Sequence, residues 1–107
     1  MLSRFFIIQI TLAIILSIPL RGVIAESLSG QIVNANGIPI PGMEVILYNP
    51  RVGPSPSQFT DTRGKFFFNY VPFPANYDLE LYWRRELVFR RLIYIRGYTR
   101  LAPITLY

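Results

Sequence analysis

A turn signal within residues 60–68 constrains the fold of this chain more than any other feature. The four residues from Asp61 to Gly64 favour a tight turn, with polar, β-prone residues before them and an aromatic run behind them. In an extended chain Phe66 and Phe68 fall on one face, where they can enter a core. Such a turn joins two antiparallel strands, so the segment predicts a β-sandwich or a β-barrel.

The N-terminus has the three-part layout of a secretory signal peptide. Arg4 supplies the positive start, Phe5–Leu20 is an apolar run without charges, and small or short residues precede Ala25. We expect cleavage after Ala25. The alternative is an uncleaved membrane anchor, but the 16-residue run is shorter than the roughly 20 residues that span a bilayer, and Arg21 ends it.

Two domain-level expectations follow: residues 1–25 are a signal peptide and residues 26–107 form one small domain. The chain contains no cysteine, which leaves disulfides and thiolate metal sites out. Small exported domains of eukaryotes usually depend on disulfides. We therefore expect a location in the bacterial periplasm or outside the cell.

The domain reads as seven short strands separated by turn signals, with no helical period. Asn36-Gly37 marks one turn, and proline corners mark others. This pattern predicts an all-β, antiparallel sandwich. The expected strands are Ser27–Asn34, Met43–Tyr48, Gln58–Thr62, Lys65–Tyr70, Tyr77–Trp83, Leu87–Arg96 and Arg100–Tyr107, the last with Pro103 at an edge or a bend, while residues 83–91 could also be a loop or a helical turn.

Several of these motifs, taken in order, resemble carboxypeptidase regulatory-like domains. The likeness covers roughly residues 27–82 and includes Ser29–Val33, Asn36–Leu47, Thr60–Phe68 and Tyr77–Leu79. The resemblance implies a seven-stranded, transthyretin-like sandwich, related to the B-type repeats of collagen adhesins, that acts as an accessory module. One departure is Ala75-Asn76, where the family has glycine before its tyrosine corner; we expect Asn76 to take the positive φ instead.

Catalytic chemistry has little support in this composition. The absence of histidine removes the commonest general base and the commonest zinc ligand. Asp78 and Glu80 share a strand face and could act as paired carboxylates, but a solvated strand face explains them more simply. Asp61 could help to bind calcium, but a turn-forming role is the simpler interpretation. We expect no enzyme, no catalytic residue, no metal and no cofactor.

Charge is distributed unevenly and points to a binding surface. Residues 84–107 hold six arginines and one acid, whereas residues 26–83 hold three basic residues and five acids. The predicted binding patch consists of Trp83, Arg84, Arg85, Arg90, Arg91, Tyr94, Arg96 and Arg100. Arginine suits bidentate contact with carboxylate or phosphate, and aromatic neighbours suit stacking.

Three interpretations of this patch stay open at the sequence level. It could contact an anionic envelope component, it could contact a protein, or it could protect edge strands from aggregation. The leading hypothesis is an exported, non-enzymatic binding or structural module with a protein or anionic envelope partner and only peripheral membrane contact. The alternative is a carbohydrate-binding domain that uses Trp83, Tyr82 and Tyr94. Export argues against a nucleic-acid partner.

Overall fold

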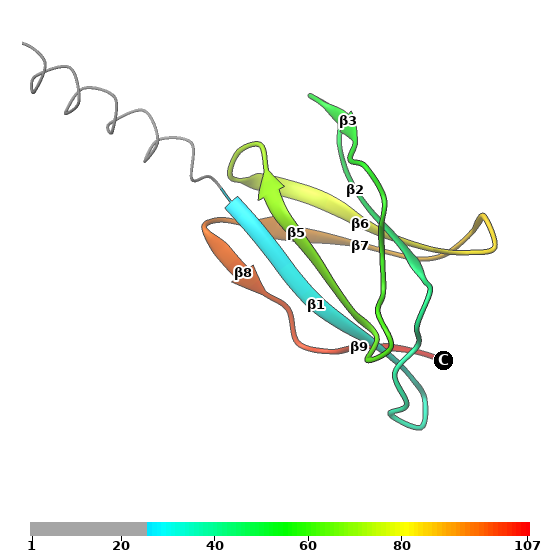
Figure 1. Cartoon of the computed structure of the whole chain (residues 1–107). Helices are drawn as coiled ribbons and strands as arrows, with labels where there is room; N and C mark the ends of the chain where they lie inside the picture. The colour runs from blue at the N-terminus through cyan, green and yellow to red at the C-terminus, as the bar shows by residue number, and fades with distance from the viewer. Residues whose placement is uncertain (1–25) are drawn as a thin grey trace, which may run out of the picture.

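The computed structural model describes residues 26–107, so the predicted signal peptide and its cleavage site lie outside the described residues. Every regular element in the described range is a β-strand (Figure 1). The strands are β1 (Glu26–Asn34), β2 (Glu44–Asn49), β3 (Gly53–Pro54), β4 (Gln58–Phe59), β5 (Lys65–Val71), β6 (Ala75–Trp83), β7 (Glu86–Ile95), β8 (Tyr98–Arg100) and β9 (Ile104–Leu106). None of residues 26–107 belongs to a helix long and apolar enough to cross a membrane.

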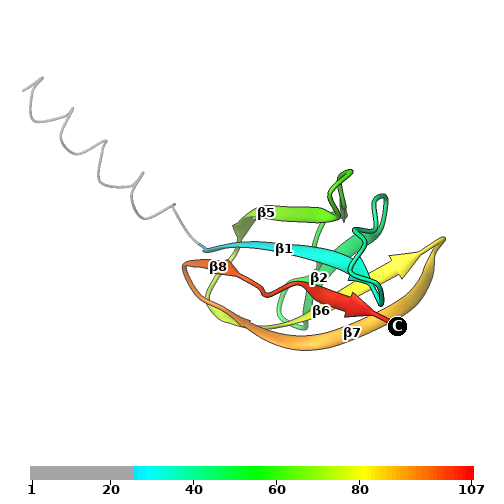
Figure 2. The same cartoon turned by 90° about the horizontal axis from the view of Figure 1, so that it is seen from below.

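These strands form two sheets that pack face to face, as the two layers of Figure 2 show. In the β1 sheet, β1 lies between β5 on one side and β8 and β9 on the other. In the β6 sheet the order is β3-β2-β6-β7, and β4 also pairs with β2. The predicted all-β sandwich is confirmed.

The strand count and the pairing at the C-terminus differ from the prediction. Nine strands replace seven because Gly53–Pro54 pairs with β2 and because the last expected strand is split into β8 and β9. The split falls at residues 101–103, where Pro103 has no N–H to donate to a ladder. Both pieces run parallel to β1, so the sandwich is not purely antiparallel.

The turn at Asp61–Gly64 forms, but the strands beside it do not pair with each other. β4 pairs with β2 in one sheet, and β5 pairs with β1 in the other. Thr60 explains the separation because its buried hydroxyl accepts a bond from the Met43 N–H at 2.8 Å and donates to the Ile40 carbonyl at 2.7 Å. The turn therefore carries the chain from one layer of the sandwich to the other.

Alternating residues of both sheets meet in one core. The β1 sheet contributes Leu28, Ile32, Phe66, Phe68, Val71 and Ile104, and the β6 sheet contributes Met43, Val45, Leu47, Tyr77, Leu79, Leu81, Ile93 and Ile95. The predicted inward face of Phe66 and Phe68 is thus confirmed.

Tyr77 forms a tyrosine corner at the start of β6. Its hydroxyl donates a hydrogen bond of 2.7 Å to the carbonyl of Phe73, four residues earlier. Burial raises the pKa of this hydroxyl. The expected positive φ at Asn76 is wrong: among residues 26–107 the only non-glycine residues with positive φ are Arg84 and Arg85. Asn76 can stay extended because it lies within the β6–β7 ladder, opposite Tyr94.

Candidate functional site

The predicted binding patch starts at the hairpin that joins β6 to β7. Trp83 pairs with Glu86, so a two-residue loop of Arg84 and Arg85 closes the hairpin. Both arginines have positive φ, 51° and 71°. Such loops favour Asn-Gly, because a side chain on Cβ makes the left-handed conformation cost about 1–2 kcal/mol per residue. The open question about residues 83–91 is thus answered by a tight β-hairpin.

Strand β7 is long, exposed and unusually apolar for an edge. Within residues 26–107 it pairs with β6 alone, and its other edge faces outward in Figure 2. Leu92 and Tyr94 are 62% and 55% exposed, and Leu87 and Val88 are 40% and 44% exposed. We call residues 84–95 the β7 edge.

The two central arginines of the β7 edge lie on opposite faces of the β6 sheet. Arg90 pairs with Glu80 and makes an ion pair of 3.4 Å with it, the only ion pair in the described part of the chain. Arg91 pairs with the buried Leu79, which places it on the core-facing side of the strand. A charge in that position on an edge strand discourages further strand pairing by like molecules.

The sequence led us to expect Glu80 on a solvated strand face, but the structure places it in a largely buried position. It is 8% exposed, and it accepts a hydrogen bond of 2.9 Å from the Tyr82 hydroxyl in addition to the Arg90 contact. The bond to Glu80 is the main cause that raises the pKa of Tyr82. The carboxylate therefore joins β6 to β7 on the outer face.

The remaining patch residues lie elsewhere. Arg96 follows the end of β7, close to the turn into β8, and Arg100 ends β8 in the other sheet. The eight predicted residues thus occupy the end of β6, the hairpin loop, both faces of β7, the turn after β7 and the end of β8, rather than one continuous surface. Most of them lie on the β7 edge.

An apolar groove opens beside the hairpin, between β7 and β9. It has a volume of about 560 Å³ and is lined mainly by Ile40, Met43, Trp83, Val88, Phe89 and Leu106. Phe89 pairs with the buried Leu81, so it marks the core-facing side of β7. The groove therefore adjoins the same edge that carries Arg91.

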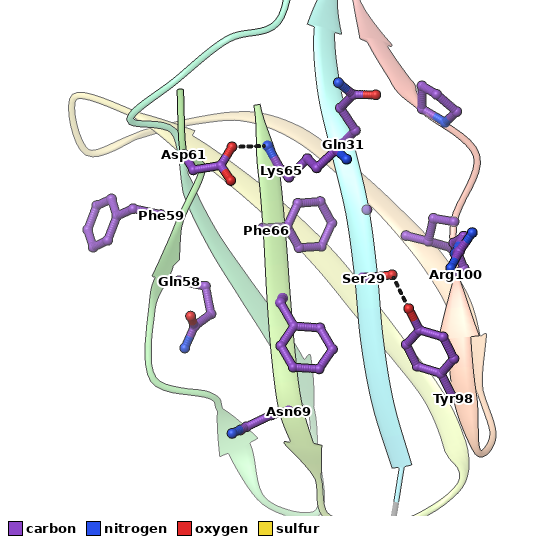
Figure 3. Close-up of a pocket in the computed structure, with 14 residues that line it drawn as sticks. Ser29, Gln31, Gln58, Phe59, Asp61, Lys65, Phe66, Asn69, Tyr98 and Arg100 are labelled. Atoms are coloured by element: carbon purple, nitrogen blue, oxygen red, sulfur yellow. Dashed lines mark hydrogen bonds between the residues drawn. The ribbon is translucent and has the colours of Figure 1, made fainter. Parts of the chain in front are cut away.

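A second hollow, of about 830 Å³, covers the outer face of the β1 sheet (Figure 3). Phe59, Phe67 and Tyr98 expose their rings there, alongside the side chains of Gln31 and Asn69. Sequence reasoning missed this surface. The available signal was the alternation in β5, because the outward Phe67 and Asn69 alternate with the inward Phe66 and Phe68.

Tyr98 connects the hollow to the predicted patch. Its hydroxyl lies 3.3 Å from the Ser29 hydroxyl, and the guanidinium of Arg100 lies 5.9 Å from the centre of its ring. Two hydrogen bonds lower the pKa of the Tyr98 hydroxyl: the bond with Ser29 contributes most and the bond with Arg100 contributes less. Arg100 thus belongs to the hollow on the β1 sheet and not to the β7 edge.

The three aromatic residues expected to bind carbohydrate do not form one platform. Tyr82 and Tyr94 both point to the outer face of the β6 sheet, but their cross-strand partners, Leu87 and Asn76, lie at opposite ends of the hairpin. At about 3.3 Å per residue the two tyrosines are roughly 20 Å apart. Trp83 closes the hairpin beside the groove.

The carboxylate of Asp61, which the sequence offered as a possible calcium ligand, holds the turn after β4 together. Asp61 accepts backbone hydrogen bonds from Lys65 at 2.9 Å and Arg63 at 2.8 Å, and these bonds lower its pKa. Residues 26–107 contain no group of three or more His, Cys, Asp or Glu side chains placed to hold a metal ion.

Comparison with known proteins adds evidence on the fold. No family model matches the chain, and no curated protein matches it by sequence. Among solved structures, the Bacillus anthracis TIE protein superposes with a TM-score of 0.60 at 10% identity, covering 76% of this chain and 16% of that one.

Two DUF3823 family proteins are also similar in structure. The protein from Bacteroides ovatus gives a TM-score of 0.57 at 20% identity over 78% of this chain and 45% of its own. The protein from Parabacteroides merdae gives 0.56 at 18% identity over 78% and 47%. The chain spans less than half the length of each of these structures. At such identities the likeness shows that the chain has the β-sandwich fold of a module found in longer bacterial proteins.

Proposed function

We propose that this chain is an exported, non-enzymatic binding module that contacts a partner protein through the β7 edge. The observation that carries the proposal is the composition of that exposed edge. It combines arginine with large apolar and aromatic residues and contains one acid and no lysine. Protein interfaces are enriched in this combination and depleted in lysine and acids.

The placement of the arginines favours a protein over a flat anionic membrane. A membrane surface would be met best by charges gathered on one face. Arg90 and Arg91 instead lie on opposite faces of the β6 sheet, on either side of the strand edge. A partner that contacts the edge itself could reach both.

Membership of the carboxypeptidase regulatory-like group is part of the same proposal. The motif order in the sequence supports it, and the two-sheet architecture with its tyrosine corner is compatible with it. In that group the module is an accessory to activities carried elsewhere, which agrees with a binding role.

Site-specific photo-crosslinking in the native host tests the proposal. A photoreactive residue at Leu92, on the β7 edge, should give a discrete adduct with another protein. The same residue at Ile38 serves as the control, because Ile38 is similarly open at 56% exposure but lies in the turn after β1. Absence of an adduct from Leu92, or equal adducts from both positions, would contradict the proposed surface.

Carbohydrate binding is the second candidate, and the hollow on the β1 sheet is what favours it. Exposed rings beside amide side chains suit stacking on sugar faces with hydrogen bonds to hydroxyl groups. A glycan array should then show a hit that Phe67→Ala abolishes and Trp83→Ala leaves intact. The opposite pattern would indicate that the carbohydrate binds at the hairpin instead. An array without hits would rule out carbohydrate binding as the function.

A further inference from the structure

The free backbone of β7 suggests how a partner would bind, and this step rests on the proposed function. Within residues 26–107, β7 bonds to β6 on one side only. Along a strand, alternate residues direct their N–H and C=O groups away from the neighbour. A ten-residue strand with one free edge is a template on which an extended peptide can add as a further strand.

Self-association at this edge is opposed by charge. If a second copy paired antiparallel with β7 near its centre, with the faces of the two sheets continuous, Arg90 would lie opposite Arg90 of the other copy, or Arg91 opposite Arg91. Like charges directly opposite one another destabilise a pair of strands. The bulge where Leu87 and Val88 both face Tyr82 also interrupts a regular ladder. An occupant of opposite charge meets no such repulsion.

The β7 edge offers cations for an acidic occupant along its whole length. Arg84 and Arg85 lie at its start, Arg91 near its middle and Arg96 just past its end. None of these four takes part in an ion pair within the described residues, since the Glu80 contact uses Arg90. Their charge is therefore available to carboxylates beside the strand.

We propose that β7 accepts an acidic, extended peptide segment of a partner protein as an additional strand of the β6 sheet. Alternate side chains of that strand would lie on the core-facing side. There an apolar residue beside Phe89 would enter the groove of about 560 Å³, and an acid two residues along would meet Arg91. Backbone bonds supply the general affinity, and the groove and arginines select the sequence.

Binding of a defined peptide tests this mode. The probe is a ten-residue peptide built on the repeat Val-Val-Glu-Glu, so that valine and glutamate alternate along each face of the added strand. It is titrated into the protein while backbone amide NMR signals are followed. Shifts should concentrate in residues 86–95, with slower hydrogen exchange at β7 amides that are open in the free protein. The same peptide with an N-methyl group on every backbone amide keeps its charge but has no N–H for a ladder on either edge, and it should not bind.

Matched variants separate strand addition from general charge attraction. Arg91→Glu should weaken binding of the probe about tenfold at low salt. Arg63→Glu makes the same charge change at an exposed turn in another part of the molecule and should have little effect. Circular dichroism and thermal unfolding confirm that both variants fold.

Several results would overturn strand addition: equal binding of the N-methylated peptide, equal loss in the two variants, shifts on the β1 sheet, no binding at millimolar peptide, or a dimer of this chain formed through β7. If the Leu92 crosslink persists while the probe fails, the protein-binding role stands and the strand-addition mode falls. If both fail, the proposed function falls as well.

Discussion

Gly64 shows at the scale of single residues how the turn after β4 is specified. It has a φ of +71°, and a Cβ added there would lie 2.4 Å from the carbonyl oxygen of Ile32. Gly37 has a similar φ of +79° but open space around it. Comparing the two positions therefore separates the energetic cost of backbone strain from the cost of a steric collision.

We predict that Gly64→Ala destabilises the fold clearly more than Gly37→Ala. Strain alone should cost about 1–3 kcal/mol at either position. At Gly64 the collision with β1 backbone adds to it, because main chain cannot move aside as a side chain can. Urea unfolding of the two variants measures the difference, and equal losses would show that the contact with Ile32 is relieved without cost.

The lowered pKa of Asp61 predicts a specific pH dependence of folding stability. Its pKa lies below the ordinary value of 3.8, chiefly because of the backbone bonds from Lys65 and Arg63. A carboxyl with a lowered folded-state pKa stabilises the fold above its unfolded pKa and loses that contribution as the pH falls through the folded value.

We therefore expect Asp61→Asn to be less stable than the parent chain at pH 6, with the gap narrowing as the pH falls below the ordinary value of 3.8. Asparagine keeps an oxygen acceptor for the turn but does not titrate. Urea unfolding across this pH range gives the test. A stability gap that stays constant with pH would mean that the charge of Asp61 contributes nothing.

The β6–β7 hairpin presents the clearest conflict at the scale of elements. Its loop needs positive φ at two positions, and the sequence supplies two arginines where Asn-Gly would fit best. Residues held in disfavoured backbone regions often serve a function that outweighs the cost. Retention of both charges at the start of the β7 edge agrees with a role in binding an acidic partner.

Replacing Arg84 with Asn and Arg85 with Gly should stabilise the protein by about 1–2 kcal/mol, because the strain at both positions is relieved. The control is Arg63→Gly, which removes an arginine where φ is not positive and should destabilise slightly by freeing the unfolded chain. Thermal unfolding measures both. The stabilised variant should also bind the acidic probe more weakly, and a loss of stability would contradict the strain argument.

The two sheets share one core at the scale of the whole molecule, so they should unfold together. Leu28 of the β1 sheet is fully buried, and Leu28→Ala should cost about 2–5 kcal/mol. Fluorescence of Trp83, the single tryptophan, reports on the other sheet. We expect its midpoint to fall in step with that of circular dichroism. A Trp83 transition that does not move would show that the sheets unfold separately.

The sequence alone determined which side chains enter the core and where the chain turns. Alternation around Phe66 and Phe68 identified the buried face of that strand, since a side-chain period of two is a local property. The β-class and the sandwich followed from it. Likewise the uneven charge directed attention to the C-terminal third.

Only the tertiary structure decided which strands are neighbours and what surfaces they form. Asp61–Gly64 is a turn in either case, but whether it joins two strands of one sheet depends on Thr60 and its bonds to Ile40 and Met43, far away in sequence. Tertiary pairing also left β7 as an open edge, placed Arg90 against Glu80 and moved Arg100 to the other sheet. Local residues specify strands and turns, whereas pairing between distant segments specifies the edge at which a partner can bind.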